Sequence, residues 1–159
     1  MLGRCTRHLD RAVESLLAAI VAAMVVVGAV QVFGRYALNS SLSWTEEFQR
    51  FCHIWLVVLA IPVGYNRASH IGMEVLSKKL PARAQRALAV IVDAAWFVLG
   101  AAVTVSTARL LSAAKFQTSA GLGLRMDWVY SGIAAGGVYL AVSAARNLAR
   151  RFAATGGER

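Results

Sequence analysis

The densest group of polar side chains in this sequence lies between residues 46 and 53. It holds two carboxylates, an amide, a guanidinium and an imidazole, at Glu46, Glu47, Gln49, Arg50 and His53. Residues three or four apart share one face of a helix, so Arg50 can pair with either Glu46 or Glu47. Such a face can contact a partner subunit, bind an ion, or form a helix entrance whose charges are solvated. We favour the partner contact, because charges at membrane depth usually need a protein partner.

One further carboxylate, Asp93, stands alone in an apolar stretch. It is the only charged residue between Ala87 and Ala108. A carboxylate at the centre of a membrane helix costs roughly 2.5–3.5 kcal/mol on insertion scales, so it should face protein or water. A relay for protons or Na⁺ would need a second convergent ligand, for which the sequence gives little support. We therefore expect Asp93 to bond a neighbouring helix near the cytoplasmic interface.

Residue patterns for catalysis are missing from the sequence. It has no glycine-rich phosphate loop, no Cys/His spacing of a metal site and no nucleophile beside a base. We therefore expect no enzymatic activity and no cofactor bound by this chain. His53 raises one rival interpretation, because four-helix membrane anchors of respiratory complexes hold haem between two histidines. His8 and His70 fall outside the expected spans, which leaves a single ligand; a haem- or quinone-binding anchor is kept as the alternative.

The elements that position these residues follow from the composition. Hydrophobic residues make up 58% of the 159 residues and charged residues only 16%, whereas soluble domains carry about 25% charged residues. Crossing a hydrocarbon core of about 30 Å takes about 20 apolar residues. Three apolar runs meet this length, and a fourth, Phe51–Asn66, does so once the turns from Trp44 are included. We predict an all-α integral membrane protein, a single domain with four transmembrane helices at roughly residues 9–36, 44–65, 84–110 and 127–147.

The distribution of basic residues sets the expected orientation. Most of the 17 Lys and Arg residues lie before the first span, between the second and third spans, or after the fourth. Segments rich in Lys and Arg remain in the cytoplasm, so we expect both termini to be cytoplasmic. Topology and anionic membrane lipids then account for the net charge of +9. The sequence shows no basic and aromatic platform, and we expect no binding of nucleic acid.

Local signals predict how the spans begin and end. Ser43 and Glu46 match a capping box, with Ser43 as the N-cap residue of the second span. Pro62 should bend that span near its cytoplasmic end. The apolar face of residues 70–80 predicts a short helix in the membrane interface, and Pro81 should open the third span in its first turn.

Tryptophans and glycines indicate how the helices sit in the bilayer and pack. Trp44 and Trp128 fit the aromatic belt at the membrane interface. Gly132 and Gly136 form a G-x-x-x-G pair, which can bring the fourth span close to another helix.

The stretch from residue 31 to residue 81 carries a specific motif. It has an Arg-Tyr pair closing the first span, an Asn in the turn, and a Trp followed by a Glu pair opening the second span, at Arg35, Tyr36, Asn39, Trp44, Glu46 and Glu47. This arrangement resembles the small membrane subunit, of the DctQ type, of tripartite ATP-independent periplasmic (TRAP) transporters. Arg67, His70–Ile71 and Leu80–Pro81 match the same family. The fourth span departs from it, because Tyr130 is followed by Ser131 where the family often has a proline.

The resemblance implies a function that the residues alone do not. A DctQ-type subunit pairs with a large membrane subunit of the DctM type, which holds the substrate and Na⁺ sites and moves as an elevator. A periplasmic binding protein of the DctP type delivers an organic acid to the pair. The small subunit braces the fixed scaffold and extends the docking surface. The resemblance thus implies a non-catalytic subunit of a Na⁺-driven importer in the bacterial inner membrane, with Na⁺ bound by the large subunit.

The polar group, the turn before it and two outlying residues are the candidates for a subunit interface or a structural motif. They are Arg35, Tyr36, Asn39, Ser43, Trp44, Glu46, Glu47, Arg50, His70 and Asp93. Besides the transporter subunit and the respiratory anchor, a free-standing membrane scaffold is the third hypothesis.

Overall fold

Four long helices make up the computed structural model of the chain, which describes residues 2–39, 43–68 and 81–156. They are α1 (Leu2–Ala37), α2 (Ser43–Ala68), α4 (Ala82–Ala114) and α5 (Met126–Gly156). Each is long and apolar enough to cross a membrane, over Asp10–Ala37, Ser43–Arg67, Ala84–Ala114 and Met126–Phe152. The prediction of an all-α protein with four transmembrane helices is therefore confirmed.

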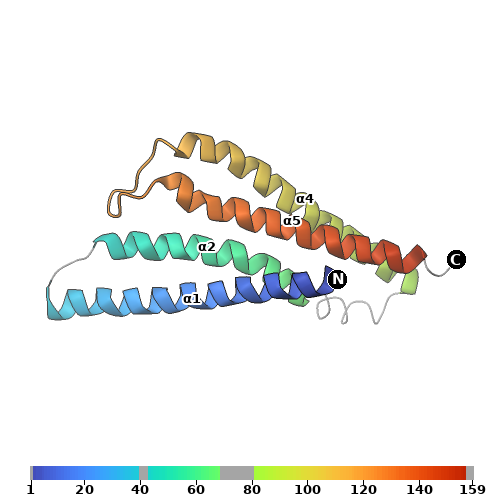
Figure 1. The fold of residues 1–159 in the computed structure, drawn as a ribbon, viewed down its shortest axis with the longest axis horizontal. Helices are drawn as coiled ribbons and strands as arrows, with labels where there is room; N and C mark the ends of the chain where they lie inside the picture. The colour runs from blue at the N-terminus through green and yellow to red at the C-terminus, as the bar shows by residue number, and fades with distance from the viewer. Residues whose placement is uncertain (1, 40–42, 69–80, 157–159) are drawn as a thin grey trace.

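The helices lie side by side in the order α1, α2, α5, α4, which differs from their order in the chain (Figure 1). Extensive contacts join α1 to α2, α2 to α5 and α5 to α4. As an edge helix, α1 has no buried residue in its most apolar stretch. Both termini lie at one end of the row, here named the terminal end (Figure 1). The end of α1 and the loop after α4 lie at the opposite end, here named the loop end.

Glycines on two sides of α5 allow its neighbours to approach closely. A β-carbon at Gly136 would lie 2.7 Å from the carbonyl oxygen of Val58 in α2, and one at Gly132 would lie 2.6 Å from a tryptophan ring in α2. Toward α4, a β-carbon at Gly100 would lie 2.9 Å from the carbonyl oxygen of Gly137. Side chains cannot occupy such short distances, so the G-x-x-x-G pair packs against α2. Small residues at a helix interface are the usual device for close packing in membranes.

A buried cluster near the terminal end connects α2, α4 and α5. Tyr65, Leu140 and Ala144 form its centre, and Trp96 packs against them. The ring centroids of Tyr65 and Trp96 are 5.5 Å apart and the rings are tilted by 45°, a favourable aromatic arrangement. Trp128, in contrast, is 71% exposed near the loop end.

The helix boundaries differ in detail from the sequence predictions. α2 begins at Ser43, so the expected N-cap residue is itself the first helical residue, within the one-residue variation typical of helix ends. Pro81 precedes α4 as its N-cap residue, with an extended ψ of 149°, and does not belong to the first turn. Pro62 lies inside α2, which continues beyond it to Ala68. The predicted interfacial helix at residues 70–80, with His70, lies outside the described residues.

Candidate functional site

The Arg-Tyr pair lies in the last turn of α1, at the loop end. Arg35 and Tyr36 are exposed, and 84% of the Tyr36 surface is accessible. The amide of Leu38 donates to the carbonyl oxygen of Gly34 at 3.2 Å, which completes the end of the helix. Asn39 then adopts a left-handed φ of 46°, a conformation that asparagine tolerates better than most residues. The motif therefore ends α1 and leaves two large side chains on the surface.

The loop between α4 and α5 forms a small hairpin, here defined as residues 117–126. The amide of Met126 donates to the carbonyl oxygen of Gln117 at 3.0 Å, and the amide of Ser119 donates to that of Leu124 at 2.8 Å. Gly123 takes a φ of 63°, which glycine adopts without steric cost. These features give the loop a defined backbone shape.

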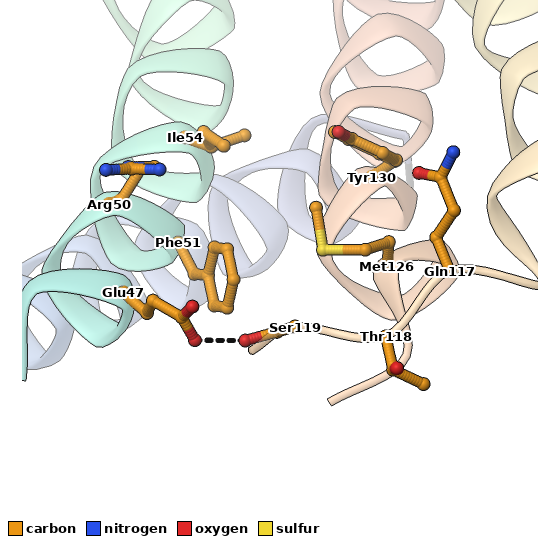
Figure 2. Close-up of a pocket in the computed structure, with 9 residues that line it drawn as sticks. All are labelled: Glu47, Arg50, Phe51, Ile54, Gln117, Thr118, Ser119, Met126 and Tyr130. Carbon is orange, nitrogen blue, oxygen red and sulfur yellow. Dashed lines mark hydrogen bonds between the residues drawn. The ribbon is translucent and has the colours of Figure 1, made fainter. Parts of the chain in front are cut away.

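Glu47 of α2 fastens this hairpin to the row of helices. Its carboxylate accepts a hydrogen bond from the hydroxyl of Ser119 (Figure 2). The amides of Gly121 and Leu122 also donate to it, each at 3.0 Å. Hydrogen bonds to a charged acceptor are stronger than those between neutral groups. Among the described residues Glu47 forms no ion pair with Arg50, the pairing that the sequence spacing permits, because the hairpin donors occupy the carboxylate.

A pocket of about 460 Å³ opens between the start of α2 and the hairpin (Figure 2). Phe51 and Ile54 line it from α2, and Tyr130 lines it from α5. Glu47 and Arg50 bring a carboxylate and a guanidinium to the same space. These groups combine apolar surface with two charges. The pocket therefore offers a place to bind a group.

Of the remaining polar residues at the start of α2, Gln49 is half-buried near Gly28 of α1, and the other three are exposed. Glu46, Arg50 and His53 are exposed and share one face of the helix, whereas Glu47 points to the hairpin. Two further candidate residues at the helix start are also exposed, Ser43 and Trp44. The polar group of the sequence is thus divided in the structure. Glu47 bonds the hairpin and Gln49 is half-buried, whereas Glu46, Arg50 and His53 have exposed side chains that a partner can contact.

Asp93 lies near the terminal end with only 1% of its surface exposed. The hydroxyl of Tyr65 in α2 donates to its carboxylate at 2.6 Å. The guanidinium of Arg151 in α5 pairs with the other carboxylate oxygen at 2.5 Å. The expected hydrogen bond to a neighbouring helix is present, and a second helix adds an ion pair. Because a buried ion pair needs such additional hydrogen bonds to offset desolvation, the three side chains form one unit that ties α4 to α2 and α5.

A second polar cluster at the terminal end attaches α1 to the row. The hydroxyl of Tyr139 in α5 donates to the carboxylate of Asp10 in α1. The amide nitrogen of Asn66 in α2 lies 3.4 Å from the same carboxylate. Arg67 of α2 also pairs with Glu14 of α1 at 2.7 Å. These polar contacts add a specific attachment to an edge helix that buries little apolar surface.

Sequence reasoning did not identify the partners of these carboxylates. Ser119 lies 72 residues from Glu47, and Tyr65 and Arg151 lie 28 and 58 residues from Asp93. No local spacing connects residues that far apart. The signal available in the sequence was a tyrosine hydroxyl near the end of an apolar span, because a buried tyrosine hydroxyl usually finds a hydrogen-bond partner.

The chemistry available to the described part of the chain is that of helix attachment and surface contact. Among these residues, no group of three or more His, Cys, Asp or Glu side chains is placed to hold a metal ion. Three of the carboxylates, at Asp10, Glu47 and Asp93, accept hydrogen bonds from other parts of the fold. Their hydrogen bonds connect all four helices and one loop.

Comparison with known proteins gives a family match over most of the chain. The sequence profile described as Tripartite ATP-independent periplasmic transporters, DctQ component, matches residues 5–154. The chain is 34% identical over 93 residues to a protein of Haemophilus influenzae named as a TRAP transporter small permease, and this match covers 58% of each protein. It thus spans little more than half the length of that relative.

Two further relatives carry more specific names. The chain is 26% identical over 128 residues to the sialic acid TRAP transporter small permease protein SiaQ of Vibrio cholerae, covering 80% of this chain and 73% of that protein. It is 40% identical over 60 residues to the isethionate TRAP transporter permease protein DctMQ of Oleidesulfovibrio alaskensis. The second match covers 38% of this chain and 9% of that protein.

Proposed function

The chain belongs to the DctQ component family of tripartite ATP-independent periplasmic transporters, and we propose that it serves a Na⁺-driven importer of an organic acid. As a small permease subunit it is a multi-pass membrane component of a transporter and not an enzyme. The observation that carries the proposal is the family match over residues 5–154, which includes all four spans. The rival hypothesis of a haem- or quinone-binding anchor has no support from the family match.

Two partners would complete the proposed transporter, a large membrane subunit of the DctM type and a periplasmic binding protein of the DctP type. The relative named DctMQ supports pairing with a large subunit, because the matched part forms only 9% of a much longer permease protein. Relatives named for sialic acid and isethionate support an organic acid as the substrate.

Within this transporter the chain acts as a brace, and Na⁺ binds to the large subunit. The support is the use of the described carboxylates. Glu47 accepts hydrogen bonds from the hairpin, and Asp93 bonds side chains of two neighbouring helices. A transported ion needs ligands that it can reach and leave, whereas these two carboxylates already have partners within the fold.

The proposed orientation has both termini in the cytoplasm of a bacterial cell, with the four spans in the inner membrane. Support comes from the bias of Lys and Arg toward the segments before the first span, between the second and third, and after the fourth. The common position of both termini at the terminal end agrees with an even number of spans (Figure 1). Basic residues on that side would also contact anionic lipid headgroups.

Reconstitution tests the proposal directly. The chain is combined with the large membrane subunit in liposomes, the binding protein is added outside, and an inward Na⁺ gradient is applied. Uptake of radiolabelled sialic acid, isethionate and C4-dicarboxylates is then measured, since relatives are named for all three. We expect uptake of an organic acid only when all three proteins and the gradient are present. Equal uptake without this chain, or a haem absorption band in the purified chain, would contradict the proposal.

A further inference from the structure

The exposed residues of α2 gather on one face along its length. Between Thr45 and Arg67 every exposed residue lies on this face, and all others are buried or half-buried. We name this set the α2 stripe. Its members are Glu46, Arg50, His53, Val57, Ala60, Ile61, Gly64 and Arg67. Residues at intervals of three and four positions share a helix face, so the α2 stripe is one continuous surface.

The half of the α2 stripe nearer the loop end is polar at a depth where the lipid is apolar. α2 has 26 residues and is about 39 Å long, whereas the hydrocarbon core of a bilayer is about 30 Å thick. With α2 centred in the bilayer, His53 lies about 10 Å inside the core, ten residues after the helix start. An imidazole is too short to reach the headgroups from there. Polar groups at such depth usually face protein or a water-filled space.

Neither His53 nor Arg50 finds a hydrogen bond or an ion pair within the described part of the chain. Arg109 of α4 is also exposed, but it lies in the second-last turn of its helix, from which a long side chain can extend to the headgroups. Arg50 interacts electrostatically with the nearby Glu47 carboxylate, but both it and His53 keep hydrogen-bonding capacity that the described residues do not use.

The half of the α2 stripe nearer the terminal end has small residues of the kind that let membrane helices pack closely. Ala60 and Gly64 are four positions apart and exposed, and a β-carbon at Gly64 would have no atom within 4 Å. At the glycines of α5, in contrast, atoms of α2 and α4 already occupy the space that a β-carbon would need. A small-x-x-x-small pair facing open space is a surface on which another helix can pack closely.

We infer that the α2 stripe is the surface on which a transmembrane helix of the large membrane subunit packs. The inference rests on the proposed function, and it adds the location and the chemistry of the contact. The partner helix would place a hydrogen-bonding or acidic group opposite Arg50 and His53, and would lie close to Ala60 and Gly64. The exposed face of α4 also has a pair of small residues, Ala102 and Ser106, but its large side chains Ile91, Val98 and Val105 are apolar and suit lipid.

Photo-crosslinking in intact membranes tests this location. A benzoylphenylalanine residue replaces Val57 or Ile61 in the α2 stripe, and the matched controls replace Val98 or Val105 on the exposed face of α4. The tagged large subunit is detected by its antibody after irradiation. We expect a crosslinked product from the two α2 positions and none from the two α4 positions.

The possible outcomes separate the inference from the proposed function. If the wild-type chain copurifies with the large subunit but crosslinks form only from α4, the inference is overturned and the proposed function stands. If wild-type copurification itself fails, the proposed function is wrong. Crosslinks that join two copies of this chain through Val57 would also overturn the inference, because the α2 stripe would then be a homodimer surface.

A substitution provides the second measurement. Replacing both Arg50 and His53 by leucine removes the polar side chains of the α2 stripe that lie within the hydrocarbon core, a change that a lipid-facing surface would tolerate. We expect recovery of the large subunit with the double variant to fall at least fivefold, at unchanged membrane insertion. The control Val98→Leu should leave recovery unchanged. Full recovery with the double variant would overturn the proposed role of the two polar side chains.

Discussion

Carboxylates at the two ends of the helix row use different kinds of partner. At the loop end, half-buried Glu47 accepts hydrogen bonds from backbone amides and a hydroxyl of the hairpin. At the terminal end, Asp93 is almost fully buried and bonds the side chains of Tyr65 and Arg151 from two other helices. The loop-end carboxylate shapes one loop, whereas the terminal-end carboxylate joins three helices. Loss of the second should therefore cost more than loss of the first.

The largest effect is expected from Asp93→Ala. This change leaves the guanidinium of Arg151 and the hydroxyl of Tyr65 without their common acceptor in a buried position. Breaking one side of a buried ion pair costs about 3–5 kcal/mol, and we expect the lower end because a third of the Arg151 side chain is exposed. The measurement is the free energy of unfolding of the purified chain in a titration with a denaturing detergent.

Asp127→Ala is the matched control for this prediction, because it also removes an aspartate from an ion pair. Its partner, Arg125, is largely exposed, and such surface pairs contribute about 1 kcal/mol or less. Equal losses from the two variants would remove the distinction between the two ends of the row.

An intermediate effect is expected from Glu47→Ala. The hairpin loses its attachment to α2, but its freed amides lie where water can replace the carboxylate, so the loss of stability should be about 1 kcal/mol. The clearer result is local. Hydrogen exchange at the amides of Gly121 and Leu122 should become at least tenfold faster, while exchange in α5 should not change.

Glu46→Ala is the control for that measurement, since Glu46 is the adjacent carboxylate and lies on the exposed face of α2. It should leave hairpin exchange unchanged. Faster exchange with both variants would mean that the start of α2, and not the Glu47 carboxylate, holds the hairpin.

The same comparison explains what the sequence could predict. Long apolar runs determined the number of spans, and the cost of an isolated membrane carboxylate was enough to predict that Asp93 bonds another helix. Local spacing allowed Arg50 to pair with Glu46 or Glu47, whereas the structure bonds Glu47 to a loop 72 residues away. Tertiary packing determines this contact, because one hydroxyl and two backbone amides of the hairpin all donate to the Glu47 carboxylate.

The order of the helices in space could not be predicted from the sequence either. Spans that are apolar on all faces have no periodic pattern to show which face meets which neighbour. The glycines of α5 carried part of that information, since Gly132 and Gly136 pack against α2. Asp10 and Tyr139 gave no comparable signal, because polar residues near span ends are common and need no partner.

The smallest effect is expected from Asp93→Asn on the Na⁺ dependence of uptake. Asparagine keeps the shape of the side chain and an oxygen that can accept the hydrogen bond of Tyr65, but it removes the charge. A carboxylate that binds Na⁺ or carries a proton would not tolerate this change. One that only joins helices loses its ion pair with Arg151, which lowers stability but does not alter Na⁺ binding. In the reconstituted three-protein system we expect most of the uptake and an unchanged Na⁺ concentration at half-maximal rate. A shift in that concentration at normal protein levels would place Asp93 in the coupling mechanism. The terminal end would then be part of the transport machinery, and its description as a purely structural attachment would be wrong.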